Sequence, residues 1–140
     1  MKILLAADGS AYTKKMLAWL VTHEEMIAPT NEFTALTIHP SLPPRARSAV
    51  GNKVVQEWHE EGAAKVLDPV VKFLGRHGHT VKKRWEVGQA GDQIAKAAKS
   101  GGYDLLIMGS HGHSALGNLV MGSVATQVLA RCEVPVLLIR

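Results

Sequence analysis

Two short apolar runs near the C-terminus constrain the fold of this chain more than any other feature. Residues 105–108 (LLIM) and residues 136–139 (VLLI) contain no polar side chain. A strand with one solvated face alternates apolar and polar residues, whereas a strand covered on both faces is apolar throughout. Strands of the second kind occur in parallel sheets with helices on both faces, so the two runs predict an α/β fold.

The rest of the chain alternates strand patterns with helix patterns. Ser10 is a favourable N-cap directly after the first strand pattern, and Pro29 ends the helix that begins there. The order βαβαβαβαβ predicts one domain, residues 1–140, with a parallel sheet and right-handed connections. The predicted strands are residues 2–7, 33–38, 79–87, 104–108 and 136–139, and the last two predicted helices are residues 89–99 and 123–132.

Two segments carry prolines that disturb this pattern. The segment that begins at Pro40 and ends at Gly51 holds three prolines, and it is predicted to be a mobile surface loop. The helix pattern that follows it contains Pro69, and a proline in a helix interior costs about 3 kcal/mol. We therefore expect a kink or break near Asp68.

Length and composition narrow the class of protein. A chain of 140 residues is long enough for one hydrophobic core. Its single cysteine, Cys132, cannot form an internal disulfide and is expected to be buried. The N-terminal sequence turns polar at Asp8, too early for a signal peptide, so we expect a cytoplasmic protein. Residues 105–130 are uncharged but contain too many polar side chains for a membrane span.

The charge balance does not favour a nucleic-acid partner. Lysine and arginine outnumber aspartate and glutamate by 16 to 12, and the densest basic patch lies within residues 72–84. No stacking platform of aromatic residues interleaves with that patch, so a solvated helix end and strand face explain it better. Trp58 and Trp85 lie within amphipathic patterns and are expected to be packing residues.

A glycine-rich segment follows the fourth predicted strand directly. Residues 108–123 (MGSHGHSALGNLVMGS) contain four glycines, and no charged residue occurs between Asp104 and Arg131. In an open parallel sheet, ligands bind outside the carboxyl ends of the strands, where the strand order reverses. The segment begins at such an end, so it is a candidate ligand site.

The residue types in this segment suit an anion. Gly109 and Gly112 have no Cβ, so the backbone can adopt positive φ there, come close to a ligand and direct its N–H groups to an anion. Gly122 and Ser123 begin the next helix, whose unpaired N–H groups and dipole favour a phosphate. The segment therefore predicts a phosphate site without a cationic side chain. Further hydrogen bonds can come from the hydroxyls of Ser110, Ser114 and Ser123.

The same residues also fit roles that involve no phosphate. The glycines could serve only to let a long loop pack. Asp8 could form an Asx-turn or cap the first helix instead of facing a ligand. His111 and His113 could bind a metal, but no cysteine or second clustered pair supports a zinc site, so we prefer imidazoles that line the phosphate loop.

The spacing Gly109-x2-Gly112-x9-Gly122-Ser123 is neither the dinucleotide fingerprint nor the P-loop. With the strand-end aspartate in KILLAADGS, the DLLIMGSHGHS junction and the closing CEVPVLLIR, the chain resembles the universal stress proteins over its whole length. The resemblance implies a Rossmann-like, open five-stranded parallel sheet of order 3-2-1-4-5. It also implies that Asp8 faces Gly109 across a cleft.

The resemblance further implies a site for ATP, or for ADP or AMP, with Mg²⁺ bound through the phosphates. Asp8 and Ala7 match positions that contact adenosine, and Ile38 matches a backbone contact to adenine. The phosphate and ribose contacts fall on the two glycine-containing segments. A homodimer through the last strand, Val136 to Ile139, is implied as well. The implied binding residues are Ala7, Asp8, Ile38, Gly109, Ser110, His111, Gly112, His113, Ser114, Gly122, Ser123 and Val124.

Three functions remain in competition. The first is a dimeric, nucleotide-binding stress-response protein in which ATP occupancy acts as a signal. The second is a slow ATP hydrolase or phosphotransferase, in which His111 or His113 assists a water molecule. The third is a module that binds a partner through the loop between Pro40 and Gly51, with the nucleotide irrelevant. The cleft lacks a lysine or arginine for phosphoryl transfer, so no catalytic residue is assigned.

Overall fold

The computed structural model describes residues 1–26, 28–113 and 120–140 of the protein. Strands and helices alternate as the sequence patterns predict, with a short 3-10 helix, η1, after the first α-helix. No helix in these three ranges is long and apolar enough to cross a bilayer. The elements are β1 (Lys2–Ala6), α1 (Ala11–Thr22), η1 (Glu24–Met26), β2 (Glu32–His39), α2 (Pro44–Val50), α3 (Asn52–Arg76), β3 (Val81–Val87), α4 (Ala90–Ser100), β4 (Leu105–Gly109), α5 (Ser123–Arg131) and β5 (Val136–Ile139).

The five strands form one parallel sheet in the order β3-β2-β1-β4-β5, which confirms the predicted order. In the centre of the sheet, Leu4 of β1 pairs with Thr34 of β2 on one side and with Leu106 of β4 on the other. The strand order therefore reverses between β1 and β4. This is the place where an open parallel sheet opens a crevice at the carboxyl ends of its strands.

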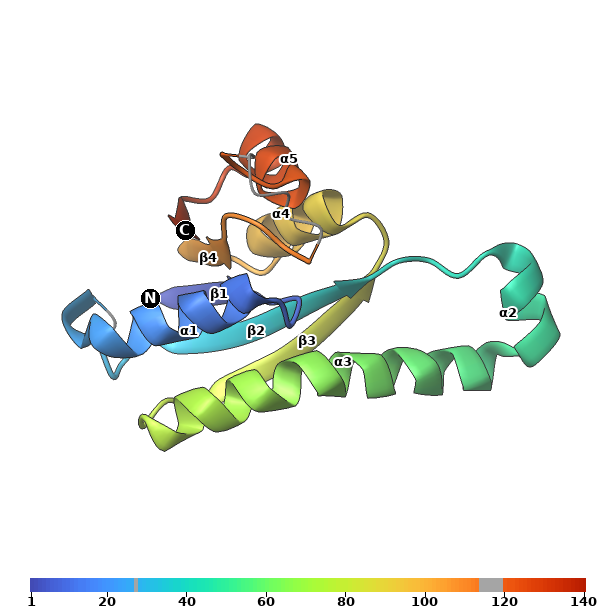
Figure 1. Cartoon of the computed structure of the whole chain (residues 1–140), viewed down its shortest axis with the longest axis horizontal. Coiled ribbons are helices and arrows are strands. Elements are labelled where there is room, and N and C mark those ends of the chain that lie inside the picture. Colours follow the sequence, from blue (N-terminus) through green and yellow to red (C-terminus); the bar gives the residue numbers. More distant parts are fainter. Residues whose placement is uncertain (27, 114–119) are drawn as a thin grey trace.

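Helices cover both faces of the sheet, with α1 and α3 on one face and α4 and α5 on the other (Figure 1). Side chains of β1 alternate between the two layers, so that Leu5 packs with Met16 and Leu67 while Leu4 packs with Leu106 and the second pair of helices. Both core layers are apolar. This explains why the central strands show no alternation of apolar and polar residues.

The segment between Pro40 and Gly51 is not an irregular loop as predicted, because residues 44–50 form the helix α2. Pro44 occupies the first helical position, where the missing N–H has no intrahelical acceptor and the fixed φ suits a helix. Gly51, with φ of +82°, separates α2 from α3. None of the residues of α2 is buried.

Of the kink or break predicted near Asp68, the break is wrong, because α3 is one continuous helix that contains Pro69. Pro69 is exposed, whereas Leu67 and Val70 on either side of it are 1% exposed in the core. Packing of these neighbours therefore holds the helix together despite the lost backbone hydrogen bond.

Two further expectations about packing need correction. Trp85 packs against the core as predicted, but Trp58 is 49% exposed, with its ring centroid 6.3 Å from that of His39 at the end of β2. Cys132 is only partly buried, since it follows the last residue of α5 near the surface. Its thiol contacts the carbonyl oxygen of Val134 at 3.5 Å.

Candidate functional site

A cavity of about 290 Å³ opens at the carboxyl ends of β1 and β4, where the strand order reverses. Ser114 lies outside the described residues, and every other predicted site residue except Ser110 lines the cavity. The glycine segment and the end of β1 therefore do face a common hollow. The lining residues are Ala6, Ala7, Asp8, Thr13, Leu36, Ile38, Ala90, Ile94, Met108, Gly109, His111, Gly112, His113, Gly122, Ser123, Val124 and Ala125.

The lining divides into an apolar part and a polar part. Side chains from β2, β4, α4 and α5, among them Ile38, Ile94 and Val124, supply apolar surface. Asp8, Thr13 and the glycine segment supply polar groups. Ligand sites typically combine such an apolar wall with a few polar groups that fix orientation. The sequence patterns missed Thr13, Ala90 and Ile94 because a threonine, an alanine and an isoleucine on a helix carry no distinctive signal.

Asp8 is held in place by hydrogen bonds on one side of its carboxylate. Its Oδ1 accepts from the backbone N–H of Ser10 at 2.9 Å and from the hydroxyl of Thr13 at 3.0 Å. The Thr13 hydroxyl in turn accepts from the backbone N–H of Asp8 at 3.1 Å. The Asx-turn and the position at the cavity, which the sequence left as alternatives, thus occur together. The anchored Oδ1 leaves Oδ2 as the oxygen on the side of Gly112.

Gly109 and Gly112 are needed for close packing, and neither uses the positive φ that glycine permits. A Cβ added at Gly109 would lie 2.6 Å from Cβ of Tyr12, and one added at Gly112 would lie 2.7 Å from Oδ2 of Asp8. Real Cβ atoms essentially never approach other atoms so closely. Glycine therefore allows the loop after β4 to lie directly against the loop after β1.

Gly122 joins the start of α5 to the same loop. Its backbone N–H donates to the carbonyl oxygen of Ser110 at 2.7 Å, and a Cβ added to it would lie 3.0 Å from Cα of His111. Its carbonyl oxygen accepts the first helical hydrogen bond, from the N–H of Thr126 at 3.0 Å. The first turn of α5 is thereby fixed against the wall of the cavity.

The N-terminus of α5 supplies the positive field of the site. Ser123, Val124 and Ala125 occupy the first helical turn, where backbone N–H groups have no intrahelical acceptor, and all three residues line the cavity. The helix dipole adds roughly half a positive charge at this end. No lysine or arginine occurs among the described residues that line the cavity. An anion there would be bound by main-chain groups.

Ser110 lies behind the cavity wall and not on it. It is 2% exposed, and its Oγ is 2.8 Å from Nδ1 of His111. Its backbone N–H donates to the carbonyl oxygen of Ile139 at 2.8 Å, and its own carbonyl oxygen accepts from Gly122. Its backbone thus holds the loop to β5 and α5, while its buried hydroxyl contacts the imidazole of His111 and does not line the cavity.

The two histidines take part in the wall of the cavity. The ring of His111 packs against Tyr12 with centroids 4.8 Å apart. Nε2 of His113 donates to the carbonyl oxygen of Asp8 at 2.6 Å, which places the proton of a neutral ring on Nε2. In the described ranges, no group of three or more metal-ligating side chains occurs.

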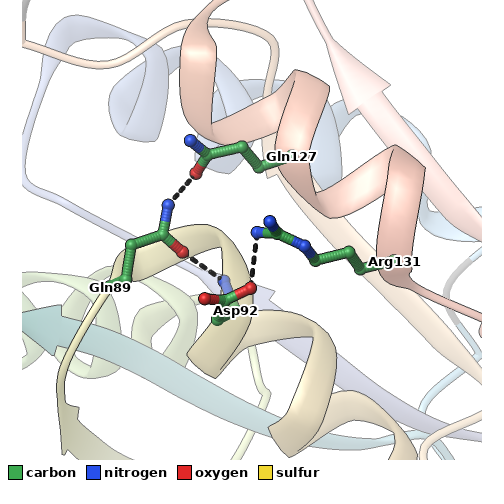
Figure 2. A network of polar contacts seen from close by, with 4 residues as sticks. All are labelled: Gln89, Asp92, Gln127 and Arg131. Carbon is green, nitrogen blue, oxygen red and sulfur yellow. Dashed lines mark hydrogen bonds and ion pairs between the residues drawn. The ribbon is translucent and has the colours of Figure 1, made fainter.

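A polar network holds together the two helices whose first turns border the cavity (Figure 2). The Gln89 side chain accepts from the backbone N–H of Asp92 at 2.7 Å, which caps α4, and it donates to the side-chain oxygen of Gln127 on α5. Asp92 forms an ion pair of 2.5 Å with Arg131. A Cβ added to Gly91 would lie 2.5 Å from Cβ of Gln127, so the helices are in close contact.

Sequence comparison finds that the chain is similar to universal stress proteins. A sequence model of the universal stress protein family matches residues 1–140. The chain is 31% identical over 139 residues to a universal stress protein of Synechocystis sp., covering 99% of this chain and 42% of that protein. It is 40% identical over 143 residues to one of Thermus aquaticus, covering 99% and 97%. It is 33% identical over 96 residues to universal stress protein MJ0577 of Methanocaldococcus jannaschii, covering 64% and 59%.

Solved structures share the fold. The structure of MJ0577 matches with a TM-score of 0.82 at 28% identity, over 99% of this chain and 94% of that one. An Arabidopsis thaliana family protein with AMP bound matches with a TM-score of 0.68 at 16% identity, over 99% and 90%. An Archaeoglobus fulgidus universal stress protein in complex with dAMP matches with a TM-score of 0.67 at 19% identity, over 100% and 98%. From the match to the family over its whole length, the chain belongs to the universal stress protein family.

Proposed function

We propose that this chain binds an adenine nucleotide in the cavity between β1 and β4. One observation carries the proposal: a single hollow of about 290 Å³ joins an apolar wall, the carboxylate of Asp8 and the N-terminus of α5. A nucleotide combines a flat base, a ribose with hydroxyl groups and an anionic phosphate chain. Each of these parts has a matching surface in the hollow.

The apolar wall suits the base. Ile38 and Ile94 border the cavity from β2 and α4, so an adenine ring between them would replace water at apolar surface. Ala7 follows β1, and its N–H donates to the carbonyl oxygen of Leu36 at 2.9 Å. The main chain on that side is therefore firmly placed beside the proposed base site.

The carboxylate of Asp8 suits the ribose. With Oδ1 held by Ser10 and Thr13, Oδ2 is the oxygen left to accept a hydrogen bond from a ribose hydroxyl. Hydrogen bonds to a charged acceptor contribute about 1.5–3 kcal/mol. A carboxylate repels phosphate, so this arrangement also favours placing the phosphates away from Asp8 and toward α5.

The start of α5 and the glycine segment suit the phosphates. Backbone N–H groups of Ser123 and Val124, with the helix dipole behind them, would donate hydrogen bonds to the phosphate oxygens without help from a cationic side chain. ATP, ADP or AMP would share this site, and Mg²⁺ would be held through the phosphates. The AMP-bound and dAMP-bound structures of the related proteins support an adenine nucleotide.

Binding, more than turnover, is the role that the site supports. His111 contacts Ser110 and Tyr12, and His113 donates to Asp8, so both imidazoles have structural partners. No observation favours the hydrolase alternative specifically. Occupancy alone can act as a signal in a cytoplasmic stress response, because a ligand at 100 times its dissociation constant stabilises the folded state by about 2.7 kcal/mol.

We also infer a homodimer through β5. This strand lies at one edge of the sheet, and Val136, Leu137 and Leu138 in it are only partly buried. Pairing of β5 with the same strand of a second copy would satisfy its free backbone groups and cover these side chains.

The direct experiment is mass spectrometry of small molecules released when the purified protein is denatured, followed by calorimetric titration of nucleotide-free protein with Mg·ATP and AMP. We expect an adenine nucleotide in the released fraction and saturable binding in the titration. Asp8→Ala and Gly122→Val should weaken binding. Asp68→Ala, at an exposed position of α3, is the matched control and should bind normally. Absence of binding at millimolar nucleotide would refute the proposal.

A further inference from the structure

A second surface of the molecule lies far from the cavity. Helix α2 and the first turns of α3, residues 44–61, form what we call the arm. Helix α2 and the start of α3 project beyond the sheet (Figure 1), and near the other end of the arm the buried His59 stacks on Trp85 of β3. Val50, Val54 and Trp58 on the arm are 49%, 50% and 49% exposed. Val54 and Trp58 are four residues apart on one helix, so they lie on the same face and form an apolar stripe.

The part of the arm that precedes His59 is not explained by the packing of a single chain. Helix α2 has seven residues and buries none of them, and its main contact in the described structure is with α3. Isolated helices of this length are not stable in water, because helices in proteins depend on tertiary packing of an apolar face. Exposed apolar groups that cluster in this way mark interaction surfaces.

The charges of the arm divide by sign along its length. The first part is basic and the second part is acidic, and all of these charged side chains are exposed. None of the ion pairs in the described part of the chain involves them. The basic residues are Arg45, Arg47 and Lys53, and the acidic residues are Glu57, Glu60 and Glu61.

We propose that a second copy of this chain covers the arm in a two-fold, antiparallel arrangement. A two-fold interface pairs each patch of one subunit with the complementary patch of the other, and does so twice. Reversing the direction of one arm brings its basic part onto the acidic part of the other. The stripe of Val54 and Trp58 then lies near the axis, where both copies bury it.

Different classes of partner match the arm less well. A nucleic acid or an anionic membrane would be attracted by Arg45 and Arg47 but repelled by the three glutamates beside the stripe. An acidic peptide would meet the same repulsion. The self-complementary pattern of charge therefore selects the chain itself as the partner. This inference does not depend on nucleotide binding.

The arm interface is distinct from the proposed pairing of β5. The arm follows β2 and leads into the helix that packs on β2 and β3, whereas β5 lies at the opposite edge of the sheet. Both interfaces can be used at once, so we expect assemblies larger than a dimer if β5 also pairs. Breaking the arm interface alone should halve the assembly mass.

The experiment is a charge exchange followed by sedimentation equilibrium of the full chain. One variant, Arg45→Glu/Arg47→Glu, makes the arm predominantly acidic, and the other, Glu57→Lys/Glu61→Lys, makes it predominantly basic. Each should have half the wild-type mass, because like charges then face each other, and mixing the two should restore the wild-type mass. Lys72→Glu/Arg76→Glu, a double reversal on the exposed far end of α3, is the control and should leave the mass unchanged.

The positions changed are exposed, so the variants should fold, and equal far-ultraviolet circular dichroism verifies this. Val54→Glu, which places a charge in the apolar stripe, should halve the mass as well. A monomeric wild type at 100 µM, or a mass that none of the arm variants changes, would overturn the proposal. So would two variants that stay apart when mixed. Binding of phosphatidylserine vesicles that Arg45→Glu/Arg47→Glu abolishes without changing the mass would assign the arm to an anionic surface instead.

Discussion

Replacing Gly112 by alanine tests the close approach of the two loops at the cavity. The new Cβ would lie 2.7 Å from Oδ2 of Asp8, and this separation must open to the 3.4 Å at which ordinary contact begins. The carboxylate cannot turn away easily, because Oδ1 is held by Ser10 and Thr13. Overpacking of this kind costs about 1–3 kcal/mol, so we expect Gly112→Ala to lower the free energy of unfolding by that amount.

The same change should weaken nucleotide binding. A displaced Oδ2 would lose its proposed hydrogen bond to ribose, and about 1.5–3 kcal/mol corresponds to roughly a 10- to 100-fold rise in the dissociation constant. Gly75→Ala is the matched control: no described atom lies within 4 Å of its added Cβ. That variant should bind normally and gain up to about 1 kcal/mol of stability, because alanine is the better helix former.

A double-mutant cycle decides whether the reasoning is correct. The described atoms within 4 Å of the added Cβ both belong to Asp8, so the cost of Gly112→Ala in urea unfolding should largely disappear in an Asp8→Ala background. The coupling energy should then approach the full cost of the single change. If Gly112→Ala lowers the free energy of unfolding equally in both backgrounds, the added methyl group does not clash with the carboxylate of Asp8.

Three further predictions concern stability. Burial, and then the neighbouring His59, lower the pKa of His39 below 6.5 in the folded chain. At a pH between the two pKa values the unfolded chain therefore binds more protons than the folded chain. The melting temperature should fall as the pH drops below about 6.5, and it should fall less in His39→Gln. Pro69→Ala should raise the free energy of unfolding by about 1–3 kcal/mol in urea, because α3 regains a hydrogen bond and loses a ring clash. Arg131→Ala removes a pair whose side chains are both 51% exposed; it should cost at most about 1 kcal/mol, and nothing measurable in about 1 M salt.

The sheet could be predicted from the sequence because its signals are local. The runs at residues 105–108 and 136–139 are apolar throughout, and Ser10 does cap α1 by accepting from the N–H of Tyr12. The effect of a proline, by contrast, depends on its position in the fold. Pro44 fits the first turn of α2, and Pro69 is exposed on a helix that its neighbours hold to the core.

The site was predictable in position but not in physical detail. The spacing of Gly109, Gly112 and Gly122 located the cavity, yet the reason for glycine is contact between loops and not positive φ. That distinction depends on Tyr12 and Asp8, which are about a hundred residues away in sequence. Ser110 shows the same limit, because only the folded chain reveals that its hydroxyl is buried against His111 while its backbone bonds to Ile139.

The backbone of Ser110 also connects the cavity to the edge of the sheet. Its N–H donates to the carbonyl oxygen of Ile139, the last residue of β5, and its carbonyl oxygen accepts from Gly122 at the start of α5. A phosphate on the first turn of α5 would thus be two hydrogen bonds from the strand that we expect to pair with a second copy. If occupancy orders this loop, it also orders β5, and linkage then requires the reciprocal effect. We therefore expect nucleotide to bind more tightly as the protein concentration rises through the range in which the dimer forms. An affinity that does not depend on protein concentration would show that nucleotide binding and dimerisation are not coupled.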